Sequence, residues 1–315
     1  MNALVVEDFK KLPRWSEFAE PKAADDGEAV VQVTASALSN LVKAIASGAH
    51  YSSGAALPFV PGVDGTGRLA DGTRVYFFQP RRPFGALGER SLARKALCIP
   101  LPDSLSDLEA AALANPVMSS WAALTRRARF QPGESVLVNG ATGTSGKLAV
   151  RVARQLGARR VVATGRDAAV LASLGADQTI SLHVAPAELA GAMAAALRDH
   201  GVSVILDYLW GPSAEALIAA IGKAHAPAPL RFVQIGSMAG NTIPLPAFAL
   251  RSSALELMGS GLGSVSDLEL VRSIGEAFAV AETARFSVET EVVKMSEGEQ
   301  AWTRGFGRKR LVFTI

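Results

Sequence analysis

The chain has 315 residues, of which 49% are hydrophobic and 19% charged, and its formal net charge is +3. This length predicts two domains with substantial cores, and the small, dispersed charge excess argues against a nucleic-acid-binding protein. One cysteine (Cys98), a charged N-terminal stretch (MNALVVEDFKK) and the lack of long apolar runs predict a cytoplasmic protein without a signal peptide, a disulfide or a membrane partner.

The first part of the chain is rich in short β-like runs that are separated by glycine and proline. Examples are 29–33 (AVVQV), 72–78 (GTRVYFF) and 96–99 (ALCI). A helix is predicted over 103–113 (DSLSDLEAAAL), with Asp103 or Ser104 as its N-cap.

From Pro132 onward, predicted strands and helices alternate. The strands are 135–139 (SVLVN), 160–164 (RVVAT), 178–182 (QTISL), 202–208 (VSVILDY), 231–236 (RFVQIG) and 255–260 (LELMGS). Helices are predicted from the glycine turn to Gly157, over 167–176, over 186–200 and near 212–222. This alternation predicts an α/β fold with a doubly wound parallel sheet, while the tail, 287–293 and 309–315, returns to β-like runs.

The turn GATGTSGK (140–147) has two interpretations as a phosphate-binding loop. A nucleotide triphosphate loop needs glycine at position 141 and a hydroxyl at 148, where the chain has Ala141 and Leu148, and leucine cannot bind magnesium. A dinucleotide turn fits as Ala141-x-Gly143-x-x-Gly146, with Thr144, Ser145 and Gly146 directing backbone N–H groups at the pyrophosphate. A purely structural tight turn is the remaining alternative.

The end of the second predicted strand distinguishes the two nicotinamide coenzymes. An NAD enzyme needs an acidic residue there for the ribose hydroxyls, whereas this chain has Gly165 and Arg166. A cation at this position suits a 2′-phosphate, so NADPH is favoured as cofactor. Arg166 as an ordinary solvated residue, and Asp167 as a ribose ligand or helix cap, remain open.

These stretches, with SNLVKAIASGAHY, LPFVPGVDGTG, VILDYLWG and KRLVFTI, resemble the medium-chain dehydrogenase/reductase superfamily, in particular its zinc-independent, zeta-crystallin-like quinone oxidoreductases. The resemblance implies a discontinuous, β-rich GroES-like catalytic domain, residues 1–118 and 261–315, and a Rossmann dinucleotide-binding domain, residues 119–260. It also implies a homodimer that pairs through the last Rossmann strand, near 255–260.

Zinc is not expected. A structural zinc site of this superfamily needs four cysteines and the catalytic one needs cysteine with histidine, but the chain has one Cys and four His. Val63 and Asp64 stand where zinc alcohol dehydrogenases carry Gly-His-Glu. Without a Lewis acid to hold an alkoxide, ordinary alcohol oxidation is not expected.

The resemblance also implies site residues. Asn40 and Tyr51 match the pair that would hydrogen-bond a carbonyl acceptor, with a helix-cap role for Ser39-Asn40 and a rim position for Tyr51 as the alternatives. Ser119 stands where the family has a threonine beside the nicotinamide, and Gly236 and Ser237 match the turn at its ribose.

The sequence therefore predicts an NADPH-dependent, zinc-independent oxidoreductase that transfers hydride to a quinone or a related conjugated carbonyl. An alkene or enoyl-thioester reductase is the alternative, for which Lys43, Arg81 and Arg82 are the candidate cations for a nucleotide handle. A non-catalytic NADPH-binding redox sensor is a further alternative.

Overall fold

The computed structural model describes residues 1–50, 53–54, 56–224, 229–304 and 309–315. It divides into two compact units, one formed by Met1–Asn115 with Ile274–Ile315 and the other by Pro116–Ser273. The domain boundaries predicted at 118/119 and 260/261 stay a prediction. No described helix is long and apolar enough to cross a membrane.

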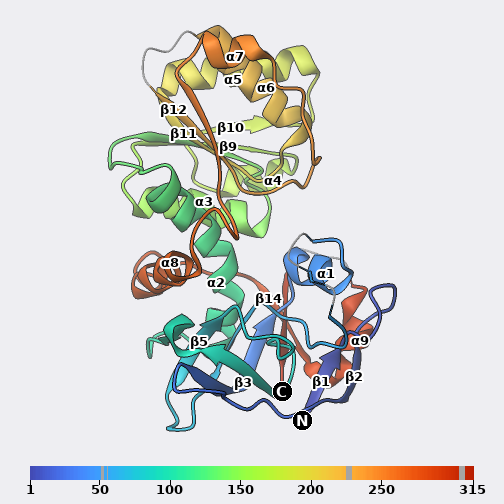
Figure 1. The fold of residues 1–315 in the computed structure, drawn as a ribbon. Coiled ribbons are helices and arrows are strands. Elements are labelled where there is room, and N and C mark those ends of the chain that lie inside the picture. Colours follow the sequence, from blue (N-terminus) through green and yellow to red (C-terminus); the bar gives the residue numbers. More distant parts are fainter. Residues whose placement is uncertain (51–52, 55, 225–228, 305–308) are drawn as a thin grey trace. The chain divides into compact units, whose positions relative to one another are not determined.

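The unit of Met1–Asn115 with Ile274–Ile315 is built on a mostly antiparallel seven-stranded sheet, ordered β14-β15-β3-β4-β5-β7 with β6 paired to β3 (Figure 1). A two-stranded sheet joins β1 to β2. The strands are β1 (Asn2–Val5), β2 (Arg14–Glu17), β3 (Glu28–Ala37), β4 (Asp64–Arg68), β5 (Arg74–Phe78), β6 (Arg90–Arg94), β7 (Cys98–Pro100), β14 (Thr290–Lys294) and β15 (Arg310–Thr314). The C-terminal strand β15 pairs antiparallel with β3, from the first part of the chain.

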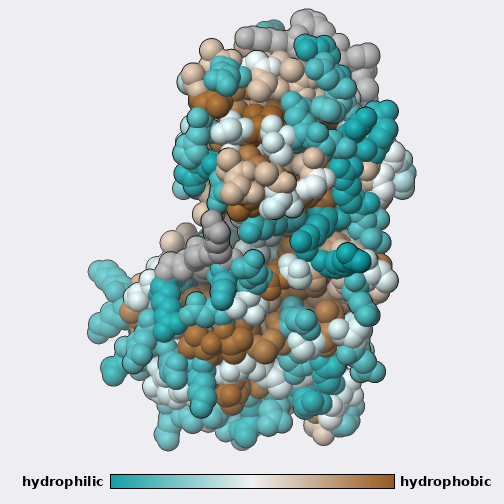
Figure 2. All heavy atoms as spheres, turned by 180° about the vertical axis from the view of Figure 1, so that it is seen from behind, coloured by the Kyte–Doolittle hydropathy of each residue, from teal (hydrophilic) through white to brown (hydrophobic). Residues whose placement is uncertain are grey.

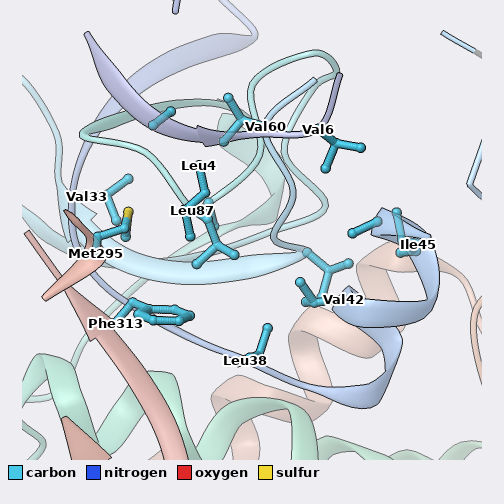
Figure 3. Packing of buried hydrophobic residues seen from close by; sticks show 14 of the residues in the cluster. Leu4, Val6, Val33, Leu38, Val42, Ile45, Val60, Leu87, Met295 and Phe313 are labelled. Atoms are coloured by element: carbon cyan, nitrogen blue, oxygen red, sulfur yellow. The ribbon is translucent and has the colours of Figure 1, made fainter. Parts of the chain in front are cut away.

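Short helices complete this unit: α1 (Asn40–Ala46), α9 (Gly298–Trp302) and the 3₁₀ turns Lys95–Leu97 and Met295–Glu297. The predicted strand 96–99 is therefore wrong in its first half, because Ala96 and Leu97 belong to a 3₁₀ turn. Figure 3 shows the core of this unit, where Val42 and Ile45 of α1 pack beside Leu38 and Val6. Those two buried contacts anchor α1, the helix that begins at Asn40.

The helix predicted over 103–113 instead spans Asp107–Ala122 (α2) and continues as one π-helical turn, Ala123–Arg127. The predicted caps Asp103 and Ser104 are wrong. Ser106 accepts the Glu109 backbone N–H at 3.2 Å, and Glu109 in return accepts the Ser106 backbone N–H at 3.0 Å. This reciprocal capping box starts the helix after Ser106, since it satisfies N–H groups at both positions.

The unit Pro116–Ser273 contains a six-stranded, fully parallel sheet in the order β10-β9-β8-β11-β12-β13. Its strands are β8 (Ser135–Asn139), β9 (Arg160–Gly165), β10 (Gln178–Ser181), β11 (Val202–Asp207), β12 (Leu230–Gln234) and β13 (Leu255–Gly259). Its helices are α3 (Thr144–Gln155), α4 (Ala168–Ser173), α5 (Pro186–His200), α6 (Gly211–Ala224) and α7 (Ala247–Arg251), with α8 (Asp267–Ala279) following β13. Each predicted strand and helix of this region is found within a few residues of its expected bounds.

Both faces of the parallel sheet are covered by helices. Figure 1 shows α5 and α6 on one face and α3 on the other. Leu137, Val162, Ile205 and Phe232 point to the α5 and α6 face and form a core with Met193 and Leu217. The strand order reverses between β8 and β11, and such a switch point is where ligands of open parallel sheets bind.

Candidate coenzyme and substrate site

The glycine turn connects β8 to α3 at the carboxyl edge of the parallel sheet. Gly140 adopts φ +92°, which favours glycine, and Gly146 packs so closely on the turn that an added Cβ would lie 2.2 Å from the Gly140 carbonyl oxygen. Ala141 is fully buried and donates its backbone N–H to the Thr164 carbonyl at 2.7 Å. The turn is therefore held against β9 with little freedom to move.

The first turn of α3 has its backbone N–H groups at the open side of this loop. Its N-cap, Gly143, has no side chain to cap them, and a Cβ built on Gly143 meets no protein atom within 4 Å. A helix N-terminus of this kind attracts anions because its N–H groups and dipole both favour negative charge. Thr144, Ser145 and Gly146 follow directly, so the geometry can accept a phosphate.

The end of β9 lies under the glycine turn. A Cβ on Gly165 would sit 2.3 Å from Cγ2 of Thr142, so only glycine lets the turn rest on the strand. Arg166, the next residue, is exposed, and Asp167 caps α4 by accepting the Val170 backbone N–H at 3.0 Å. Asp167 is therefore the N-cap of α4, one of the two roles that the sequence left open for it.

A pocket of about 460 Å³ lies at the other half of the same sheet edge, beyond the ends of β12 and β13. Its lining residues are Trp210, Gln234, Ser237, Asn241, Leu257, Met258 and Gly259. Ser237 belongs to the turn predicted for the ribose. Gly236 lies beside it, and a Cβ there would meet the Tyr208 carbonyl oxygen at 2.7 Å. With strands about 4.8 Å apart, the pocket lies about 10 to 15 Å from the strand that feeds the glycine turn.

Ser119 on α2 reaches the loop that follows β11. Its hydroxyl donates to the Pro116 carbonyl at 2.7 Å and lies 3.1 Å from the Tyr208 hydroxyl. Since the one proton of Ser119 is committed to Pro116, Tyr208 is the donor of this second bond. Burial raises the pKa of Tyr208 to about 12, so the phenol keeps its proton.

All the predicted coenzyme-binding residues therefore lie in the unit Pro116–Ser273, around the carboxyl edge of one sheet. The two predicted catalytic residues do not belong to this unit. Asn40 is the exposed first residue of α1, whose N-cap is Ser39, which accepts the Val42 backbone N–H at 3.2 Å. Tyr51 lies outside the described residues. The binding and catalytic roles of all these residues stay predictions.

The cations proposed for a nucleotide handle all have partners within the protein. Lys43 Nζ donates to the Arg304 carbonyl at 3.0 Å, and Arg81 pairs with Glu28 at 2.6 Å. The guanidinium of Arg82 stacks 4.3 Å from the ring centre of Phe59. Burial lowers the pKa of Lys43. These contacts weaken the case for an open basic channel at these three positions.

At the zinc position of the superfamily, Asp64 is buried and accepts a hydrogen bond from the Tyr76 hydroxyl at 2.9 Å. Burial raises the pKa of Asp64 to about 6, against the opposing charge of Arg310. Within the described part of the chain, no group of three or more His, Cys, Asp or Glu side chains is placed to hold a metal ion.

Several residues at the sheet edge line the pocket or support the glycine turn, although the sequence pattern predicted no role for them. Trp210, Gln234 and Met258 line the pocket; Thr164 accepts a backbone N–H of the glycine turn, and Asn139 accepts the Thr164 hydroxyl proton. A signal was available, since each lies at or just after the carboxyl end of a predicted parallel strand, where ligands of such sheets bind. Which of these side chains enter the pocket depends on loop conformation.

No protein-family model matches the chain. The Emericella nidulans protein named "Probable NADPH-dependent quinone reductase tdiC" is 27% identical over 315 aligned positions, which cover 87% of this chain and 88% of that relative. A phenolphthiocerol/phthiocerol polyketide synthase subunit of Mycobacterium tuberculosis is 30% identical over 167 positions. That match covers 52% of this chain but only 7% of the synthase protein.

Among solved structures, the quinone oxidoreductase of Thermus thermophilus, determined alone and with NADPH, aligns over 100% of both chains. Its TM-score is 0.81 and its sequence identity 27%. The predicted fold class, a Rossmann parallel sheet with a β-rich second part, is confirmed by this likeness together with the sheet topology.

Proposed function

We propose that this chain, a quinone oxidoreductase-like oxidoreductase of the medium-chain dehydrogenase/reductase superfamily, uses NADPH to reduce a quinone or a related conjugated carbonyl. One observation carries the proposal. The uncapped N-terminus of α3 follows β8 at the switch point of the sheet, and a pocket opens at the same edge beyond β12.

The residues of the glycine turn fit a dinucleotide pyrophosphate. The open space at Gly143 lets phosphate oxygens approach the backbone, and the N–H groups of Thr144, Ser145 and Gly146 supply donors there. The tight packing of Gly146 keeps the helix end against the strand. When bound, the reduced nicotinamide supplies the hydride; the protein supplies position and hydrogen bonds.

Arg166 carries the preference for NADPH over NADH. It is exposed directly after β9, where an acidic residue would serve the ribose hydroxyls of NADH. The adjacent carboxylate, Asp167, is occupied in capping α4. A guanidinium without a competing ribose ligand beside it favours the 2′-phosphate.

The acceptor end uses the pocket beyond β12 and β13. Trp210 offers a flat apolar face and Met258 a flexible apolar contact for a planar conjugated ring, and Gln234 and Asn241 offer hydrogen bonds to its oxygens. On the coenzyme side, Ser119 donates its hydroxyl proton to Pro116 and accepts from Tyr208, which leaves one lone pair for the carboxamide N–H of a bound nicotinamide. Asn40 and Tyr51 remain our candidates for the groups that bind the carbonyl being reduced.

We propose that the reaction is independent of zinc. The chain has one Cys, and at the superfamily's zinc position it has Val63 and Asp64, of which the latter is buried against Tyr76. An acceptor that is already electron-poor, such as a quinone, needs no Lewis acid to receive hydride. Ordinary alcohol oxidation would need one.

An alkene or enoyl-thioester reductase is the second candidate, because half of this chain matches a segment of a polyketide synthase. In that case hydride would go to the β-carbon of the unsaturated substrate. The internal partners of Lys43, Arg81 and Arg82 argue against a large anionic handle at these residues.

We also propose a homodimer that pairs through β13. In the described part of the chain this edge strand pairs only with β12, which leaves one row of backbone groups unpaired. Leu257 of β13 and the nearby Met238, Phe248 and Leu250 expose 36%, 69%, 47% and 45% of their surface. Figure 2 shows that hydrophilic residues cover much of the molecular face drawn there, with hydrophobic residues gathered in patches.

The experiment that tests the function is anaerobic NADPH oxidation by the purified protein with a simple quinone or with an α,β-unsaturated ketone. We expect faster turnover with the quinone and little with NADH. Faster turnover with the enone would replace the leading proposal by the alkene reductase. Binding of NADPH without turnover of either acceptor would contradict both.

A further inference from the structure

A row of polar side chains crosses the parallel sheet at its carboxyl edge. The row is in Cα register from strand to strand and comprises Thr164 (β9), Asn139 (β8), Asp207 (β11) and Gln234 (β12). Two residues earlier on the same strands, the corresponding row is Val162, Leu137, Ile205 and Phe232, all part of the core beneath α5 and α6. Because side chains two apart on a strand share a face, the polar row is the edge of that core.

Three members of the row form a hydrogen-bond chain with one direction. Both oxygens of Asp207 accept, and the Asn139 amide nitrogen donates to Asp207 Oδ1 at 2.8 Å and to Ser213 Oγ at 2.9 Å. This turns Asn139 Oδ1 towards Thr164, whose hydroxyl donates to it at 2.6 Å. The Thr164 oxygen is then left to accept the Gly140 backbone N–H at 3.2 Å. Asp207, Asn139 and Thr164 are all fully buried.

The Thr164 end of this chain holds the glycine turn. Thr164 accepts two successive N–H groups of the turn, that of Gly140 with its hydroxyl and that of Ala141 with its carbonyl at 2.7 Å. Two hydrogen bonds to consecutive N–H groups fix the two peptide planes that carry them, and this sets the direction in which the rest of the turn leaves β8.

The Asp207 end holds the wall of the pocket. Its carboxylate accepts the backbone N–H groups of Leu209 at 3.1 Å and of Trp210 at 3.1 Å. Trp210 lines the pocket, and the Leu209 side chain lies where a Cβ on Gly140 would meet it, at 2.8 Å. One buried carboxylate therefore connects the pocket wall with the phosphate-binding turn.

We propose that Asp207, Asn139 and Thr164 form a positioning relay that orients the glycine turn for the coenzyme pyrophosphate without touching the coenzyme. The inference rests on the proposed coenzyme site. Asp207 and Thr164 lie two strands apart, about 10 Å, and Asn139 is hydrogen-bonded to both. If the three residues form a relay, the effects of substitutions at its two ends on NADPH binding are coupled. If the two ends act independently, the free-energy effects of the two substitutions add at that separation.

The first experiment measures NADPH affinity by fluorescence titration for the unsubstituted protein, T164V and T164S. Valine keeps the shape of threonine and removes its hydroxyl, so we expect NADPH to bind on the order of tenfold more weakly. Serine keeps the hydroxyl and should bind NADPH nearly as tightly as the unsubstituted protein. The matched control is S273A, which removes another fully buried hydroxyl, one that donates to Glu269 within α8. NADPH affinity in T164V equal to that in S273A would overturn the relay.

The second experiment is a double-mutant cycle with T164V and D207N, again on NADPH affinity. The relay predicts that the double variant loses much less than the product of the two single losses, because either substitution already breaks the chain. Multiplicative losses would show two independent contributions and refute the relay.

A third measurement does not depend on the coenzyme. Exchange of the Gly140 amide hydrogen, followed by NMR in the coenzyme-free protein, should be slow in the unsubstituted protein and T164S and fast in T164V. If the unsubstituted protein failed to bind NADPH, the proposed function would be wrong, and this exchange pattern would still decide the relay. The same measurement decides it if D207N fails to fold, and equal exchange in all three proteins would refute it.

Discussion

Replacing Gly143 with alanine should separate coenzyme binding from folding. Gly143 adopts φ −81° and ψ 167°, a conformation that any L-residue accepts, and its added Cβ would meet no protein atom within 4 Å. The methyl group would instead occupy the space that we assign to the pyrophosphate. We therefore expect a folded protein that binds NADPH poorly.

The magnitudes follow from the same geometry. Alanine is a poorer N-cap than glycine but reduces the entropy of the unfolded chain, so the free energy of unfolding should change by less than about 1 kcal/mol. Each charge-assisted hydrogen bond lost to the phosphate contributes about 1.5 to 3 kcal/mol, so NADPH affinity should fall about 10- to 150-fold. Thermal unfolding and fluorescence titration measure the two quantities.

The matched variant is Gly146→Ala, whose Cβ would lie 2.2 Å from the Gly140 oxygen and 2.6 Å from Ala141 Cα. Both are backbone atoms of a tethered turn, so the clash should cost about 3 kcal/mol and lower Tm by about 6 to 12 °C. Wild-type NADPH affinity in Gly143→Ala, or a stability loss as large as in Gly146→Ala, would refute the reasoning.

Four further outcomes are expected. Arg166→Ala should weaken NADPH binding about 10- to 150-fold in titrations but leave NADH nearly unchanged, and equal losses would contradict our phosphate assignment. Trp210→Ala should raise KM for the acceptor about 2- to 12-fold in steady-state assays with little change in NADPH affinity; an unchanged KM would remove the pocket from the acceptor site. Treatment with a metal chelator should leave the rate unchanged, and lost activity restored by zinc would show zinc dependence. The pKa of Asp64 is about 6 in the folded protein and 3.8 in the unfolded chain, so its ionisation destabilises the fold as pH rises from about 4 through 6. Asp64→Asn should therefore gain about 3 kcal/mol relative to the unsubstituted protein between pH 4 and 7 in denaturant titrations, and a pH-independent difference would contradict the raised pKa.

The sequence by itself determined the parallel half of the fold. Its strands, such as 135–139, are short apolar runs followed by amphipathic helices, and this local alternation leaves one simple solution, a parallel sheet covered on both faces. The role of the glycine turn could also be predicted from the sequence, because Leu148 excludes a magnesium-binding loop and the strand–turn–helix order selects the dinucleotide interpretation. The sequence also contains the capping-box pattern S-x-x-E at Ser106, where the helix begins, although Asp103 and Ser104 are possible caps by residue type.

Only the tertiary structure decided how side chains distant in sequence meet. Thr164, Asn139 and Asp207 each end an apolar strand, but their common register depends on strand order and on the face that each strand turns to α6. The pocket depends in the same way on where the loops after β11 and β12 run, and loop paths follow from packing rather than from periodicity. Local sequence patterns thus determined which elements form and where phosphate can bind, while long-range register determined which buried polar groups hold that site in place.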